Sequence, residues 1–135
     1  MLSHLNLGLE DKLHTKVGAL SGGQRQTLAL LMATMNPIEF LILDEHTAAL
    51  DPKTAAKVLS ITREIVEEEK LTTIMITHNM KDALAHGNRL IMMNAGRIIL
   101  DVSGEEKAKL TVEDLLSIFA KSGSDGASND RMLLV

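Results

Sequence analysis

The chain has 135 residues, the length of one ordinary domain, with 45% hydrophobic and 24% charged residues. This balance is that of a globular protein and not of a disordered tail. The absence of cysteine excludes disulfides and thiolate metal sites. The longest uncharged run, 26–38, is too short to span a membrane, and we expect no secretory leader. A net charge of −4 argues against a nucleic-acid partner.

Residues 1–20 are weakly patterned and predict a short helix or a loop, whereas the following stretch has a clear helical pattern. Between residues 24 and 35 the apolar side chains recur at the spacing of one helix face. They are Leu28, Leu31, Met32 and Met35. Asn36 and Pro37 end this helix, because the residue before a proline is pushed out of the helical conformation.

Two strand patterns flank a second helix. The run 40–43 is too short for a helix and apolar at every position, which predicts a strand buried on both faces, as in a parallel sheet. Asp51 and Pro52 predict the start of a helix that extends to about Lys70, since aspartate accepts hydrogen bonds from the free N–H groups and proline has none. A β-branched run at 72–77 predicts the second strand.

The remaining pattern completes an α/β fold. A short helix over 79–86 is ended by Gly87, and the order strand, helix, strand, helix predicts parallel strands with right-handed crossovers. Strands at 89–93 and 97–101 around a glycine-containing turn predict a hairpin. A capping box at 111–114 starts a last helix to about residue 121. Residues 122–135 are rich in Ser, Gly, Asp and Asn and are expected to be disordered.

The first candidate site is the segment Ser21, Gly22, Gly23, Gln24 at the start of the first helix. Ser21 and Gln24 have the spacing of a capping box, which explains them structurally. The two glycines stay unexplained, since each costs roughly 1 kcal/mol in a helix relative to alanine. Glycines keep side chains away from the backbone N–H groups at the positive end of the helix dipole. The segment is therefore also a candidate phosphate site.

The second candidate site is Asp44 and Glu45, directly after the strand at 40–43. Ligands in doubly wound sheets bind outside the carboxyl ends of the strands. Asp44 is a hard oxygen ligand suited to Mg²⁺ on a nucleotide, and Glu45 could orient or deprotonate an attacking water. The alternative interpretation is a strand that simply exits into a polar turn.

Two further residues are weaker candidates by themselves. His78 follows the strand at 72–77, on the rim that also carries the two carboxylates, where its imidazole could hydrogen-bond a phosphate or a water. Asp51 is explained as a helix cap. The other four histidines lack the spacing of a metal site, and we interpret them as having no functional role; they are His4, His14, His46 and His86.

Four segments together resemble the ATP-binding cassette (ABC) transporter ATPases. They are Leu-Ser-Gly-Gly-Gln-Arg-Gln from Leu20, Phe-Leu-Ile-Leu-Asp-Glu from Phe40, Ala-Leu-Asp-Pro from Ala49 and Ile-Thr-His from Ile76. The resemblance covers most of the chain except the tail. It implies a partial P-loop NTPase-type parallel sheet flanked by helices, with residues 1–121 as the C-terminal portion of a nucleotide-binding domain.

The resemblance also implies roles for single residues. Ser21, Gly22, Gly23 and Gln24 would form the signature loop, which contacts the γ-phosphate of ATP held by the opposite subunit. Asp44 would help to hold Mg²⁺, Glu45 would be the catalytic base, Asp51 would lie at the dimer seam, and His78 would be the switch histidine. The implied partners are a second ATPase subunit, in a head-to-tail dimer formed on ATP, and membrane permease subunits. The implied location is cytoplasmic, on the inner face of the cell membrane.

The sequence departs from the family pattern at two places. His46 stands where the family usually has proline or alanine, in a stretch that looks like a subset of bacterial importers, with amino acids as the cargo class. The Gly-x-x-x-x-Gly-Lys-Ser/Thr phosphate cradle is absent, and no glutamine precedes Gln24 to serve as a Q-loop. We therefore expect the chain alone not to bind ATP with ordinary affinity and to show no ATPase activity.

Three functional hypotheses follow. The leading one is the C-terminal half of a transporter cassette ATPase. The second is the C-terminal lobe of a chromosome-maintenance or repair ATPase, against which the acidic net charge and the absence of N-terminal heptads count. The third is a non-catalytic regulatory partner that offers its signature loop to a complete cassette.

Overall fold

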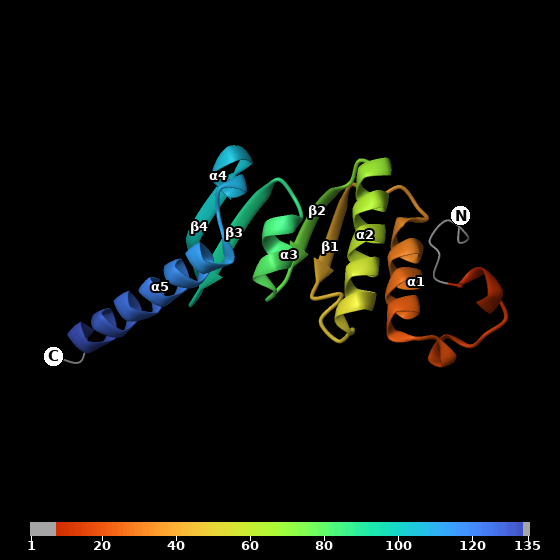
Figure 1. The fold of residues 1–135 in the computed structure, drawn as a ribbon, viewed down its shortest axis with the longest axis horizontal. Coiled ribbons are helices and arrows are strands. Elements are labelled where there is room, and N and C mark those ends of the chain that lie inside the picture. Colours follow the sequence, from red (N-terminus) through yellow and green to blue (C-terminus); the bar gives the residue numbers. More distant parts are fainter. Residues whose placement is uncertain (1–7, 134–135) are drawn as a thin grey trace. The chain divides into compact units, whose positions relative to one another are not determined.

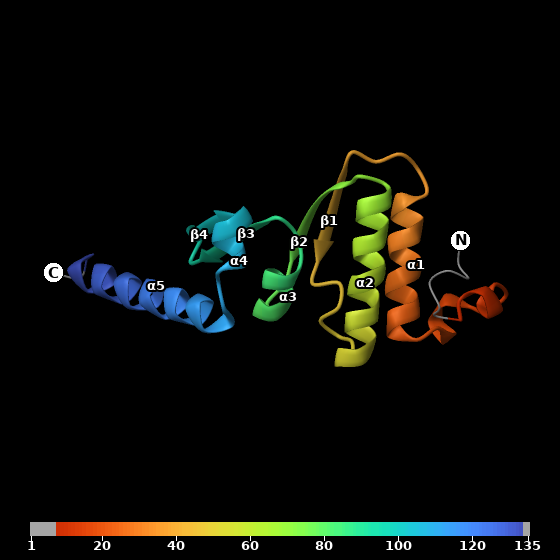
Figure 2. The ribbon, with the colours of Figure 1, turned by 45° about the horizontal axis from the view of Figure 1, so that its top comes forward.

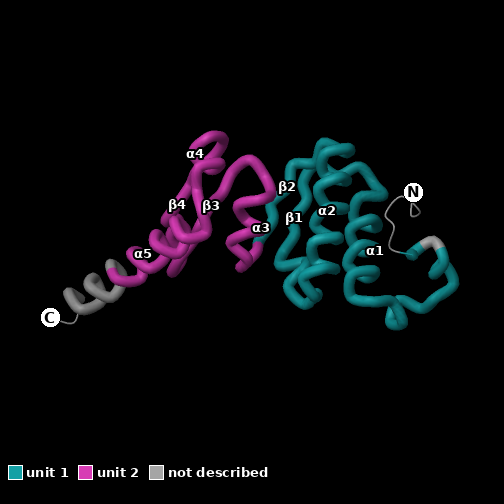
Figure 3. The backbone as a smooth tube through the Cα atoms, in the orientation of Figure 1, with its two compact units in different colours: residues 1–76 teal, residues 77–135 magenta. Residues whose placement is uncertain are grey.

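The computed structural model describes residues 8–133 and divides into two compact units, Met1–Ile76 and Thr77–Val135 (Figure 3). The described residues of unit 1 form the single-turn 3₁₀ helices η2 (Glu10–Lys12) and η3 (Val17–Ala19), followed by α1 (Gly22–Thr34), β1 (Phe40–Asp44), α2 (Pro52–Glu68) and β2 (Thr72–Ile76). Unit 2 contains α3 (Met80–Ala85), β3 (Arg89–Asn94), β4 (Arg97–Ser103), α4 (Gly104–Ala108) and α5 (Val112–Leu133) (Figure 1). The predicted α/β fold is confirmed.

Unit 1 is built on a parallel pair of strands. β1 and β2 align from Phe40 opposite Thr72 to Asp44 opposite Ile76, and α2 is the crossover between them. In both ribbon views α1 and α2 lie side by side next to this pair (Figure 2). The predicted strand–helix–strand unit and its parallel direction are thereby confirmed.

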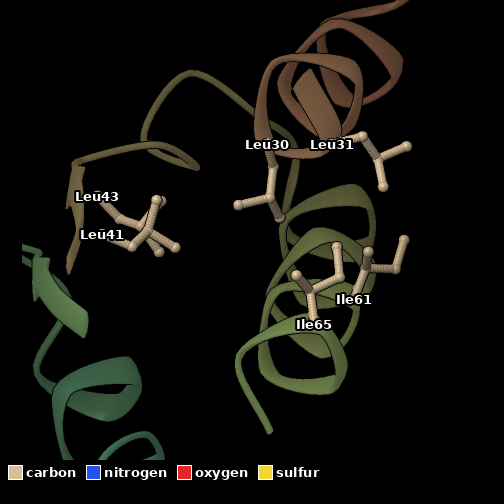
Figure 4. Close-up of a cluster of buried hydrophobic side chains, with 6 residues drawn as sticks. All are labelled: Leu30, Leu31, Leu41, Leu43, Ile61 and Ile65. Carbon is tan, nitrogen blue, oxygen red and sulfur yellow. The ribbon is translucent and has the colours of Figure 1, made fainter. Parts of the chain in front are cut away.

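A small apolar core joins the two helices to one face of the sheet. Its buried members are Leu30 and Leu31 of α1, Leu41 and Leu43 of β1, and Ile61 and Ile65 of α2 (Figure 4). Burying one leucine or isoleucine side chain contributes about 1.5–3 kcal/mol, so this cluster is the main stabilising feature of unit 1. Ile61 and Ile65 are four residues apart and therefore lie on one face of α2.

The prediction that the strand at 40–43 is buried on both faces is wrong. Leu41 and Leu43 are buried, but Phe40 and Ile42 on the opposite face are 48% and 62% exposed. The neighbouring strand continues this face with Ile74 and Ile76, which are 51% and 44% exposed. The reason is that, among the described residues of unit 1, helices pack on one side of the sheet.

The predicted buried face of the first helix is also wrong in part. Met32 and Met35 are 63% and 75% exposed, whereas the buried residues of α1 are Gly23, Thr27, Leu30 and Leu31. The contact face begins at a glycine because the two helices approach closely there. The spacing of apolar residues cannot identify such a face, because glycine and threonine are not counted among the apolar residues.

Unit 2 contains the predicted hairpin. β3 and β4 are antiparallel and joined by Ala95 and Gly96, both at positive φ (49° and 74°). Positive φ at both residues is what a two-residue turn needs if its twist is to match that of the two strands. Arg89 and Asp101 form a two-pronged ion pair at the other end, with nitrogen–oxygen distances of 2.8 and 2.7 Å.

The structure differs from the sequence-based expectation after the hairpin. The short helix α4 was not predicted; its Lys107 is 6% exposed and donates to the carbonyl oxygens of His86 and Gly87 at 2.6 and 2.7 Å. The capping box at Thr111 and Asp114 is present, with both reciprocal bonds at 2.9 and 3.2 Å. However, α5 continues to Leu133 and so includes residues that we expected to lie in a disordered tail. None of the helices described for residues 8–133 is both long and apolar enough to cross a membrane.

Candidate functional site

The segment at the start of α1 forms the predicted capping box. The Ser21 Oγ accepts a hydrogen bond from the Gln24 N–H at 3.2 Å, and the Gln24 Oε1 accepts one from the Ser21 N–H at 3.0 Å. Two backbone N–H groups that could meet an anion are therefore used inside the box. Ser21 is exposed, so the helix start still faces solvent.

The structure gives the two glycines a packing reason. A Cβ atom on Gly22 would lie 2.9 Å from Cδ2 of Leu50, and one on Gly23 would overlap Cγ2 of Thr54. The start of α1 thus packs against Leu50, just before α2, and against Thr54 in the first turn of α2. This close approach brings the signature segment and the segment before Asp51 around one hollow, lined by Gly22, Arg25, Gln26, Ala29, Ala49 and Leu50.

Asp44 and Glu45 lie at the carboxyl end of the parallel strand pair. Asp44 is the last residue of β1, opposite Ile76, and the Glu45 N–H donates to the Ile76 carbonyl oxygen at 2.9 Å. Both carboxylate residues are exposed. Glu45 has a φ of 49°, in the left-handed region that non-glycine residues rarely occupy. The chain therefore leaves the strand direction at Glu45.

The loop after Glu45 ends at the cap of α2. The Asp51 carboxylate accepts a hydrogen bond from the Thr54 N–H at 3.1 Å, and Pro52 begins the helix, both as predicted. Hydrogen bonds from the Thr54 side chain and then from its backbone N–H lower the pKa of Asp51. Asp51 is thus a helix cap, and a role at a dimer seam stays a prediction.

Within the described residues, no group of three or more His, Asp or Glu side chains could hold a metal ion. Asp44 and Glu45 therefore offer an incomplete donor set. Mg²⁺ keeps several waters and is usually bound through one or two carboxylates together with phosphate oxygens of the substrate. The pair fits a Mg²⁺ ion that arrives with a nucleotide and does not fit a metal site made by the protein alone.

His78 belongs to unit 2, directly before α3. It is exposed, and its neighbours fix the backbone around it. The Asn79 N–H donates to the Thr77 Oγ1 at 3.0 Å, and the Asn79 Oδ1 caps α3 by accepting from the Lys81 N–H at 3.0 Å. Because His78 and the two carboxylates belong to different units, their shared rim stays a prediction.

One residue near the candidate site has more contacts than its sequence pattern suggested. His46, which we interpreted as having no role, is half-buried and its Nε2 lies 3.1 Å from the Thr62 Oγ1 of α2. The available signal was its departure from the family's usual proline or alanine directly after Glu45.

Comparisons with known proteins agree with these motifs. A family model described as ABC transporter matches residues 1–48. The tyrosine transport ATP-binding protein of Clostridioides difficile is 50% identical over 119 residues, covering 88% of this chain and 47% of that protein. The methionine import ATP-binding protein of Streptococcus agalactiae is 35% identical over 83% of this chain and 33% of that protein.

A solved structure supports the same relationship. An inward-facing ABC transporter matches the fold with a TM-score of 0.69 and 30% identity, over 88% of this chain and 46% of that one. The chain therefore spans between a third and about half of the length of these two relatives, and about half of the structure that it matches. The four ordered motifs, the parallel strand pair and these matches show that the chain belongs to the family of ABC transporter ATPase domains.

Proposed function

We propose that this chain is the C-terminal half of an ATP-binding subunit in a bacterial ABC importer, the half that carries the catalytic base. The observation that carries the proposal is the strand end at which Asp44, opposite Ile76, is followed by Glu45, whose N–H bonds to the Ile76 carbonyl oxygen. Successive carboxylates at the carboxyl end of a parallel strand are suited to nucleotide chemistry. The chain would work with a second ATPase subunit and with permease subunits on the inner face of the cell membrane.

Each carboxylate has a distinct proposed task. Asp44 would bind Mg²⁺ that arrives with ATP, and the ion would neutralise charge on the phosphates. Glu45 would accept the proton of the attacking water. Its side chain is exposed, so water can reach it in this fold. His78 would hydrogen-bond the terminal phosphate or the water.

The signature segment would act on a nucleotide held elsewhere. Ser21, Gly22, Gly23 and Gln24 are at the positive end of the helix dipole of α1. The capping box fixes this end of the helix, and the packing of Gly22 and Gly23 holds it against the segment leading into α2. A helix start that is held in place in this way favours the binding of a γ-phosphate that the opposite subunit presents.

The uncovered sheet face supports the need for a second polypeptide segment. Parallel sheets occur almost only with both faces covered, yet Phe40, Ile42 and Ile74 are exposed on one face of β1 and β2. The sequence also lacks the phosphate cradle and its lysine. A segment that supplies both the cradle and an apolar layer would complete the domain.

The proposed cargo class is amino acids or similarly small polar metabolites. It rests on relatives whose names specify tyrosine, methionine and phosphonates. The tyrosine transport protein has the highest identity of these three, which favours an amino acid.

An ATPase assay tests the proposal. The chain is assayed alone and together with the portion of the Clostridioides difficile tyrosine transport protein that it does not match. We expect background activity alone, turnover in the mixture, and loss of at least about 100-fold in a Glu45→Gln mixture, because general base catalysis contributes about that factor. Glu64→Gln, at an exposed position on α2, is the matched control. Turnover by the chain alone that disappears in Glu45→Gln would contradict the proposal.

A further inference from the structure

The backbone at Glu45 needs support from its surroundings. Its φ of 49° is unusual for a residue with a Cβ atom. A left-handed non-glycine residue costs free energy and persists only where the surrounding structure over-determines it. Two backbone hydrogen bonds contribute, one from the Glu45 N–H to the Ile76 oxygen at 2.9 Å and one from the Ala48 N–H to the Glu45 oxygen at 3.1 Å.

A side-chain hydrogen bond ties the next residue to the core helix. The Nε2 of His46 lies 3.1 Å from the Oγ1 of Thr62, which is in the middle of α2 and 5% exposed. Thr62 is on the same buried face of α2 as Ile61 and Ile65, so its position is fixed by the core of unit 1. The loop after β1 is therefore attached to a rigid element as well as to the neighbouring strand.

The direction of this hydrogen bond follows from the second contact of Thr62. Its Oγ1 lies 2.8 Å from the Val58 carbonyl oxygen, which can only accept. The single hydroxyl proton is used in that bond, so the Thr62 oxygen accepts from His46. The imidazole must then carry a proton on Nε2.

We infer that His46 is a positioning residue that holds Glu45 in its left-handed conformation through the Nε2–H···Oγ1 bond to Thr62. The inference rests on the proposed function of Glu45 as the base. Proline or alanine, the residues that the resemblance implies at this position, has no side-chain donor and could not form this bond.

Nuclear magnetic resonance of the ¹⁵N-labelled full chain tests the inference without nucleotide, so its outcome is separate from that of the ATPase assay. We expect neutral His46 to be the Nε2–H tautomer, with a ring signal that shifts in Thr62→Val and is retained in Thr62→Ser. His46→Ala and Thr62→Val should each speed amide exchange at Glu45 by about two- to tenfold, as expected for one lost side-chain hydrogen bond. The double variant should add little to either single change.

Two comparisons separate positioning from general destabilisation. The amide of Ala55, which donates to Asp51 in the first turn of α2, serves as the reference, because a loss of global stability speeds both amides alike. His46→Gln retains a donor and should restore slow exchange at Glu45, and His14→Ala, at an exposed position of the same unit, should change neither amide. A His46 ring protonated on Nδ1 alone, or equal changes at Glu45 and Ala55, would overturn the inference.

Discussion

The two units differ in the contacts that hold their strands together: these contacts are local in the sequence in unit 2 and long-range in unit 1. In unit 2, β3 and β4 are joined by the two-residue turn at Ala95 and Gly96, and the ion pair of Arg89 with Asp101 closes the far end. In unit 1, the whole of α2 separates β1 from β2, and the pair depends on helices packed on one face. The hairpin is thus stabilised locally, whereas the parallel pair depends on tertiary contacts.

This difference changes the meaning of exposed apolar side chains. Ile91 and Met93 of the hairpin are 46% and 60% exposed, values close to those of Ile42 and Ile74 in unit 1. An antiparallel sheet commonly faces water on one side, but a parallel sheet does not. The open face of the hairpin therefore needs no further explanation, whereas the open face of unit 1 is unusual for a parallel pair of strands.

The largest effect should come from the close approach of α1 to α2. Gly23→Ala places a Cβ atom against Cγ2 of Thr54, and overpacking of this kind costs about 2 kcal/mol. Urea unfolding of the chain measures the loss. The additional change Thr54→Ser removes the overlapping methyl group and should recover most of the stability. Gly18→Ala, where no atom of the described part of the chain lies within 4 Å of the added Cβ, is the control; an equal loss there would contradict the packing explanation.

In unit 2, the corresponding prediction concerns the buried Lys107. Its burial lowers the pKa of the amine, and its Nζ donates to the carbonyl oxygens of His86 and Gly87. Lys107→Met leaves these carbonyls without their donor and should cost about 1–2 kcal/mol, measured by urea unfolding. Lys109→Met, at an exposed position two residues further along the chain, should change little. Equal effects of the two changes would show that the tie does not stabilise unit 2.

Most of the local structure of both units could be predicted from the sequence. The caps at Ser21 and Asp51 and the turn at Gly96 have strong local chemistry, so α1, α2 and the hairpin were placed within a few residues. The candidate carboxylates were found because they end an apolar strand. Local patterns extend over one turn or one strand and therefore give these features directly.

The tertiary contacts could not be predicted in the same way. The buried face of α1 runs through Gly23 and Thr27, which do not contribute to an apolar pattern. The bond between His46 and Thr62 joins residues 16 positions apart, so no local spacing shows it. The burial of one face of β1 depends on which layers are present, and the sequence of a single strand does not contain that information.

Substitutions of two buried threonines should change the free energy of unfolding by a smaller amount and in opposite directions. Thr27 is 0% exposed and its hydroxyl has no hydrogen-bond partner among the described residues, whereas Thr62 bonds to Val58 and His46. Thr27→Val removes an unsatisfied polar atom at nearly constant volume and should raise the free energy of unfolding by up to about 1 kcal/mol. Thr62→Val should lower it by about 1 kcal/mol. A loss of stability in both variants, measured by urea unfolding, would contradict the assignment.

The smallest effect should appear at low pH. A hydrogen bond from Arg89 lowers the pKa of Asp101 in the folded chain. A carboxyl group whose folded pKa is depressed contributes stability above its unfolded pKa, and this contribution is lost as the pH falls through the folded value. Urea midpoints below about pH 4 should therefore fall less steeply in Asp101→Asn than in the wild type. An identical slope in the two proteins would show that the hairpin ion pair is not linked to stability; Asp11→Asn is the matched exposed control.

Binding of the complementary polypeptide tests the central claim most directly. The claim is that unit 1 has half of a nucleotide site and an open sheet face that another segment covers. Sedimentation of the chain with the unmatched portion of the Clostridioides difficile protein should show a one-to-one complex. Ile42→Asn, at a side chain that is 62% exposed, should abolish this complex, and Ile91→Asn on the hairpin should not. A monodisperse chain that unfolds cooperatively and does not bind the complementary portion would contradict the account.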